Sequence, residues 1–140
     1  MKAGSGEHFE QSYNAQAAVD IDEMLIVGPF LTNDPNDKEQ LNPVVESISK
    51  DVTDPENVLV DTGCYSAKAV QKLEADSGPT VYSAIEKTGH QRTVSDLEKK
   101  IDPEKPADAA GVKEATRYRL STEEGRALYK QRKQTVEPVF

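Results

Sequence analysis

The sequence predicts an α/β protein in which short strands alternate with helices. Two apolar runs, at residues 58–60 and 80–85, are too short for helices and are bounded by turn-forming residues, so they predict buried strands. Residues 41–52 instead carry apolar side chains at helical spacing. Strands that alternate with helices in this way are typical of the α/β class.

The first elements are predicted to be two strands. Residues 1–9 are rich in small residues and predict a disordered lead-in. Residues 11–20 and Met24–Leu31 predict strands, and the short turn between them indicates an antiparallel hairpin. Gly28 and Pro29 weaken the second strand locally, because proline cannot donate a ladder hydrogen bond.

A helix and the first buried strand follow. Asn36 or Asp37 can cap this helix. Apolar residues recur along it at Leu41, Val44, Val45, Ile48 and Val52. Residues 53–57 then predict a turn that leads into the strand at 58–60.

A second helix and strand come next. Ser66 can cap the helix, and its inward-facing residues are expected to be Val70 and Leu73. Residues 77–79 contain glycine and proline and end it before the strand at 80–85.

The remaining chain is predicted to hold an insertion and a last helix. Residues 87–115 are charged and contain two prolines, which predicts a poorly packed insertion with one short helix around 94–100. Ser121 or Thr122 caps the last helix, which extends to about residue 137.

Length and composition predict one domain, residues 1–140, in the cytoplasm. No run approaches 18 apolar residues and the start has no apolar signal core, so we expect no membrane span and no secretion. The single cysteine, Cys64, suits a reducing compartment and excludes an intrachain disulfide. His8, His90 and Cys64 do not have the spacing of a zinc site.

The charge is negative overall but uneven. A net charge of −8 disfavours DNA binding by the chain as a whole, because phosphate affinity comes from lysine and arginine. The stretch Arg117–Lys133 nevertheless contains six basic residues and only two acidic ones. This stretch is either a solvated helix face or a DNA contact, and its composition does not distinguish the two.

Two carboxylates occupy positions that suit metal chemistry. Asp61 directly follows the strand at 58–60, and Glu137 lies on the last helix, four residues after Lys133. Two acids presented in this way can hold a divalent metal for phosphoryl transfer. Each also has a simpler interpretation: Asp61 can shape a turn, and Glu137 can pair with Lys133 on a solvated helix face.

Four segments follow one another in a recognisable order: Ser12–Asp20, Leu31–Asp37, Asp61–Ser66 and Tyr129–Phe140. In this order they resemble a core strand, the loop after the next strand, the motif of the second Asp and the segment of the Glu in bacterial insertion-sequence DDE transposases. The resemblance covers about residues 8–90 and 118–140.

The resemblance implies a ribonuclease-H-like mixed sheet with flanking helices and an activity in DNA transposition. Enzymes of this family cleave and transfer DNA strands with Mg²⁺ or Mn²⁺ held by carboxylates. Asp61 would bridge two metal ions and Glu137 would complete one of the metal sites. Tyr129, Arg132 and Lys133 would contact DNA phosphate near the cut.

The departures from the family pattern are also informative. The family uses three acids, and the strand that carries the first Asp would precede residue 8. We therefore expect a fragment of the catalytic core, truncated at both ends, without its first strand and inactive alone. Glu137 lies five residues after Arg132 and four after Lys133, so either residue can fill the family's basic position.

Other acids and other functions are also compatible with parts of the pattern. Asp20 is expected to point away from the edge that carries Asp61, and Asp34 and Asp37 are predicted to be caps rather than ligands. A non-catalytic domain that self-associates or pairs with a full-length transposase remains open. An Asp-dependent phosphohydrolase is disfavoured, because that class needs a second Asp where this chain has Gly63.

Overall fold

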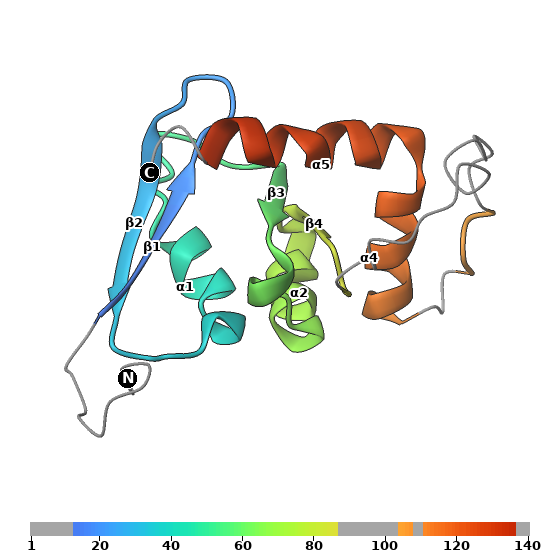
Figure 1. Cartoon of the computed structure of the whole chain (residues 1–140), viewed down its shortest axis with the longest axis horizontal. Helices are drawn as coiled ribbons and strands as arrows, with labels where there is room; N and C mark the ends of the chain where they lie inside the picture. The colour runs from blue at the N-terminus through green and yellow to red at the C-terminus, as the bar shows by residue number, and fades with distance from the viewer. Residues whose placement is uncertain (1–12, 87–103, 108–110, 137–140) are drawn as a thin grey trace, which may run out of the picture.

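The computed structural model describes residues 13–86, 104–107 and 111–136. Within these residues the chain is a mixed α/β structure, as predicted. Its strands and helices are, in chain order, β1 Asn14–Val19, β2 Ile26–Thr32, α1 Leu41–Glu46, β3 Asn57–Val60, α2 Ala67–Glu74, β4 Thr80–Ser83, α4 Val112–Ser121 and α5 Glu123–Val136 (Figure 1).

Strands β1 and β2 form the predicted antiparallel hairpin. The register pairs Asn14 with Thr32 at the open end and Val19 with Ile26 near the turn. In the turn, the Asp20 carboxylate accepts the backbone N–H groups of the second and third residues after it, at 3.0 and 2.9 Å. Asp20 therefore shapes the hairpin turn.

Strands β3 and β4 pair in parallel, with Asn57 opposite Thr80 and Val60 opposite Ser83. The sequence predicted a single mixed sheet. Among the described residues, the strands instead form two separate two-stranded sheets, β1–β2 and β3–β4. The separation arises because no described strand lies between β1 and β3.

The first predicted helix is shorter than expected. Asn36 caps a short 3₁₀ turn, η1 (Asp37–Glu39), by accepting the N–H of Lys38, and α1 begins only after it. Helix α1 ends at Glu46, where the Ser47 hydroxyl donates to a carbonyl of the last turn at 2.6 Å. Val52 therefore lies beyond the helix and is 65% exposed, so its predicted helical position was wrong.

The hydrophobic core lies where α1, α2 and β4 meet. Among the described residues, its buried apolar side chains are Leu41, Val70 and Val81. Partly buried apolar residues around them come from α1, β3, the segment before α2, α2 itself and the start of α4: Val45, Val58, Val60, Tyr65, Ala69, Leu73 and Val112. Because this core is small, hydrogen bonds and ion pairs between side chains of different elements also have to hold the structure together.

The sequence did not predict α4, because residues 112–115 were assigned to the insertion. The helix packs against β4 and α2, and its Thr116 is fully buried. The rest of the insertion is described only at 104–107. The lead-in at 1–9 and the short helix predicted around 94–100 lie outside the described residues.

Thr122 caps helix α5. It is one of the two caps predicted from the sequence, the other being Ser121. The Thr122 hydroxyl accepts the N–H of Gly125 at 3.1 Å, which satisfies a first-turn donor. A Cβ atom at Gly125 would collide with the backbone carbonyl oxygen of Arg119. The close approach of α4 and α5 therefore requires glycine at this position.

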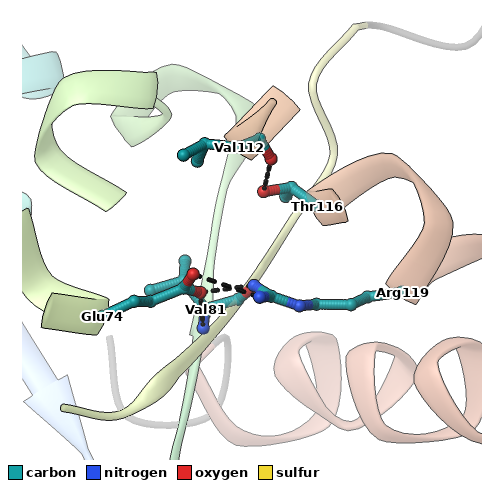
Figure 2. A network of polar contacts seen from close by, with 5 residues as sticks. All are labelled: Glu74, Val81, Val112, Thr116 and Arg119. Carbon is teal, nitrogen blue, oxygen red and sulfur yellow. Dashed lines mark hydrogen bonds and ion pairs between the residues drawn. The ribbon is translucent and has the colours of Figure 1, made fainter. Parts of the chain in front are cut away.

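An ion pair closes the outer edge of β4 (Figure 2). The Arg119 guanidinium binds both carboxylate oxygens of Glu74, and it also donates to the carbonyl of Val81 at 2.9 Å. The N–H of Val81 in turn donates to the Glu74 carboxylate at 2.9 Å. Both backbone groups of Val81 are thus satisfied by side chains at a position where a neighbouring strand would otherwise bind.

We predict that Arg119→Ala lowers the free energy of unfolding by about 2–4 kcal/mol, because it leaves a mostly buried carboxylate and a strand carbonyl without their donor. Urea denaturation followed by circular dichroism measures the change. Arg117→Ala is the matched control on the same helix. Its ion pair with Glu86 is exposed, so the loss should stay below about 0.5 kcal/mol. Equal losses for the two variants would contradict the assignment of Arg119 as an edge-closing residue.

Candidate functional site

Asp61 follows β3 directly and its side chain is 61% exposed. It precedes a 3₁₀ turn, η2 (Thr62–Cys64), but its carboxylate makes no capping hydrogen bond to that turn. The turn-shaping interpretation of Asp61 is therefore not supported by its hydrogen bonds. The carboxylate stands at the carboxyl end of a parallel strand, where functional groups of α/β proteins commonly lie.

Helix α5 crosses the ends of both parallel strands (Figure 1). The Tyr129 hydroxyl donates to the carbonyl of Val60 at 3.0 Å and accepts the N–H of Ala84 at 3.4 Å. Since Val60 ends β3 and Ala84 directly follows β4, one hydroxyl holds the helix against both strand ends.

Arg132 lies one helical turn after Tyr129 and contacts Asp61. One of its terminal nitrogens is 3.4 Å from a carboxylate oxygen of Asp61, and the guanidinium lies 5.4 Å from the centre of the Tyr129 ring. The Arg132 side chain is only 23% exposed. Its Nε is buried and has no hydrogen-bond partner among the described residues. Arg132 is thus held in place while retaining an unused donor.

Cys64 reports on the electrostatics of this region. Its partial burial raises the pKa of the thiol above the ordinary value, and the negative charges of Asp37 and Asp61 raise this pKa further. The positive charge of Arg132 acts in the opposite direction. The pKa of the thiol therefore depends on the charges of both Asp61 and Arg132.

The acids before α1 have local structural roles. The Asp34 carboxylate accepts the N–H of Asn36 at 2.9 Å, as expected for a turn acid. The Asp37 carboxylate is not a cap. It accepts the side-chain amides of Asn14 and Gln16 from β1, at 2.6 and 3.1 Å. The sequence did not predict these amide contacts, because they join residues more than 20 positions apart and nothing local indicates them.

The structure brings together three of the five candidate site residues: Asp61, Tyr129 and Arg132. Lys133 is exposed on α5. Glu137 lies outside the described residues, directly after the last residue of α5, so its position relative to Asp61 remains a prediction.

The basic stretch at the C-terminus is partly used within the molecule. Arg117, Arg119 and Arg132 form ion pairs with acids on other elements. Lys130 and Lys133 are exposed, and neither lysine forms an ion pair with a residue in the described part of the chain. The stretch is therefore neither a purely solvated face nor an uninterrupted basic surface.

Metal ligation can be assessed from the donors present. Within residues 13–86, 104–107 and 111–136, no three His, Cys, Asp or Glu side chains lie together in a way that could hold a metal ion. Asp61 supplies one exposed carboxylate, which fits the chemistry of Mg²⁺, a hard ion often held by one or two carboxylates and several waters. In the same part of the chain, no helix has the length and apolarity to cross a membrane.

Comparison with known proteins gives the family. The chain matches the family described as "Transposase DDE domain" over residues 2–140. It therefore belongs to the transposase DDE domain family, whose members function in DNA transposition. Searches of curated proteins and of solved structures returned no match.

We predict that charge-neutral substitutions at the Asp61–Arg132 pair shift the reactivity of Cys64 in opposite directions. Asp61→Asn removes a negative charge and lowers the thiol pKa, so alkylation at a fixed alkaline pH becomes faster. Arg132→Gln removes a positive charge, raises this pKa and makes alkylation slower. The pH profile of the iodoacetamide reaction rate measures both shifts.

The control for these profiles is Asp51→Asn, which neutralises an exposed acid elsewhere in the chain. Its profile should match that of the unsubstituted chain. Profiles that coincide for all three variants would show that Cys64 does not lie near the Asp61–Arg132 pair.

Proposed function

We propose that this chain provides part of the catalytic core of a DDE transposase, with Asp61 and Glu137 as two of its metal-binding acids. The observation that carries this proposal is the placement of Asp61. Its exposed carboxylate lies at the end of β3 and contacts Arg132. Arg132 belongs to α5, whose last residue directly precedes Glu137. The family match and the order of the acids in the sequence support the same function.

The two acids would hold Mg²⁺ or Mn²⁺, whose hard character suits carboxylate oxygens. Such an ion, when bound, polarises a phosphoryl oxygen and lowers the pKa of a coordinated water or hydroxyl. The chain's own contribution is positional. Tyr129 keeps α5 against the strand ends, and Arg132 places a guanidinium next to the Asp61 carboxylate.

Arg132 and Lys133 have different roles in this proposal. Arg132 is only 23% exposed and lies over the Tyr129 ring, so its terminal nitrogens suit a phosphate bound close to the metal site. Lys133 is exposed and suits a phosphate farther along the DNA. Both residues can thus contact DNA without filling the same position.

The fold belongs to the same proposal. We assign the β1–β2 and β3–β4 pairs to one ribonuclease-H-like arrangement, with room for a strand between β1 and β3. The isolated chain is proposed to be inactive in strand cleavage, because Asp61 and Glu137 alone leave a two-metal site short of carboxylates.

We predict that Mn²⁺ binds weakly at Asp61. Titration of the ¹⁵N-labelled chain with Mn²⁺ should broaden the amide signals of Val60, Thr62 and Cys64 first, because paramagnetic relaxation falls steeply with distance. Asp61→Asn should abolish this selective broadening, since it removes the anionic ligand, and Glu137→Gln should weaken it.

Asp51→Asn serves as the control for the manganese titration, and its broadening pattern should be unchanged. Uniform broadening, or a pattern insensitive to Asp61→Asn, would argue for a non-catalytic domain. Metal-dependent nicking of a supercoiled plasmid by the isolated chain, abolished by Asp61→Ala, would contradict the proposed inactivity but not the metal site.

We predict that the exposed lysines of α5 dominate binding to duplex DNA. Lys133→Glu should reduce affinity at low salt and lower the slope of log affinity against log salt by about 1, because one phosphate contact is lost. Fluorescence anisotropy with a labelled duplex measures both quantities. Lys50→Glu is the charge-matched control, on the loop after α1. Equal effects of the two substitutions would remove the argument for a DNA-binding face on α5.

A further inference from the structure

We propose that Asp37 is a positioning residue for the candidate site, and that it acts through the two short 3₁₀ turns. Asp37 begins η1, and Asp61 directly precedes η2. The two turns pack against each other. In this inference Asp37 holds η1 in place, η1 supports η2, and η2 fixes the backbone of Asp61. The inference rests on the proposed function, because Asp61 is the metal-binding acid that is positioned.

The Asp37 carboxylate joins η1 to the beginning of β1. Its Oδ1 accepts the side-chain amide of Asn14 at 2.6 Å and that of Gln16 at 3.1 Å. The Gln16 amide also donates to Oδ1 of Asn14 at 2.8 Å. Hydrogen bonds to an ionised acceptor are stronger than those between neutral groups. These three side chains, called the η1 anchor below, therefore tie the loop firmly to the strand.

The loop that contains η1 is itself ordered by side chains. The Thr32 hydroxyl accepts the N–H of Asp34 at 3.1 Å, and the Asp34 carboxylate accepts the N–H of Asn36 at 2.9 Å. Asn36 caps η1, and the Gln40 side-chain amide donates to the carbonyl of Asn36 at 3.1 Å. Connecting loops are commonly the most mobile parts of a fold. The bonds along this loop instead indicate a rigid support.

The η2 turn needs such a support because it has little of its own. Its backbone bonds join Cys64 N–H to the carbonyl of Asp61 at 3.1 Å, and Tyr65 N–H to the carbonyl of Thr62 at 3.3 Å. Hydrogen bonds of 3₁₀ turns have poor geometry. The Asp61 side chain adds no capping bond. On the side of Gly63, a Cβ atom would meet no described atom within 4 Å. The packing of η2 against η1 therefore has to hold the turn.

Electrostatics place the η1 anchor close to the candidate site. Burial raises the pKa of the Cys64 thiol, and the negative charges of Asp37 and Asp61 both raise this pKa further. One thiol is thus within range of both carboxylates. A metal-binding carboxylate has to be held to within about 0.5 Å by the residues that support it. A displacement of η1 next to η2 is therefore large enough to affect metal binding at Asp61.

The bonding of both amides to one oxygen of Asp37 gives a sharp test. Asparagine retains one side-chain carbonyl oxygen, so Asp37→Asn keeps an acceptor for the η1 anchor while it removes the charge. Asp37→Ala removes both. The measurement is NMR hydrogen exchange on the intact 140-residue chain without metal. The amides of Cys64 and Tyr65 report the opening of η2.

The inference predicts that Asp37→Ala accelerates exchange of the Cys64 and Tyr65 amides about tenfold, because η2 loses its support and opens locally. Asp37→Asn should keep both rates within about threefold of the unsubstituted chain. Asp20→Ala is the matched control. It also removes a carboxylate that accepts two N–H groups, but at the other end of β1, so it should leave the η2 amides unchanged.

A titration with Mn²⁺ gives the second readout. The concentration that half-broadens the amide signals of Val60 and Thr62 should be about threefold higher in Asp37→Ala than in Asp37→Asn. The two variants have the same charge, so this difference reports the position of Asp61 and not the electrostatic attraction of the ion. A role of Asp37 confined to the stability of its own loop would not produce it.

Either of two results would overturn the inference. The first is unchanged exchange at η2 in Asp37→Ala while the η1 amides of Lys38 and Gln40 exchange faster, which would confine Asp37 to its own loop. The second is an equal effect of Asp37→Asn and Asp37→Ala on both readouts, which would assign the effect to charge.

Gln16→Ala decides the question if circular dichroism shows that Asp37→Ala does not fold, because this variant removes only one of the two donors to Asp37. Faster exchange of the η2 amides supports the anchor, and unchanged exchange overturns it. The exchange measurement contains no metal, so it is independent of the proposed metal site. A lack of selective Mn²⁺ broadening in the unsubstituted chain would remove the metal site and leave the anchoring of η2 by Asp37 intact.

Discussion

The hydrogen bond from the Tyr129 hydroxyl to the carbonyl of Val60 holds α5 across the carboxyl ends of β3 and β4, and the site depends on it. With α5 fixed there, Arg132 lies within ion-pair distance of Asp61 and stacks on the Tyr129 ring. Among the described residues the core has only three buried apolar side chains, so side-chain hydrogen bonds and ion pairs between elements contribute to holding them together. The Glu74–Arg119 pair has the same role at the other side of β4.

Two isolated two-stranded sheets are marginal structures in water, and each depends here on the helices that cover it. Helix α1 lies in contact with both strands of the β1–β2 sheet, and α5 contacts both strands of the β3–β4 sheet. The same α5 carries Arg132, which pairs with Asp61 at the end of β3, so the helix that supports the second sheet also positions the candidate site.

Much of the secondary structure could be predicted from local sequence. Apolar runs bounded by turn residues indicated β3 and β4, and the polar turn after β1 indicated the hairpin. Helix α4 was missed because its buried positions include Thr116, whose hydroxyl bonds within the helix, so that apolar periodicity is weak. Asp61 could be selected as a candidate because it follows a predicted strand, and Tyr129 and Arg132 because they match the family motif; their roles stay predictions. The contacts of Asp37 with β1 and the split of the sheet depend on long-range packing that no local pattern encodes.

The central claim is that Asp61 and Glu137 hold a common metal ion. A crystal structure of the chain soaked with Mn²⁺, with anomalous difference density recorded near the manganese edge, tests it most directly. The account predicts a peak within coordination distance, about 2.0–2.3 Å, of carboxylate oxygens from both residues. A peak on one acid alone, or carboxylates on opposite sides of α5 with no shared density, would contradict it.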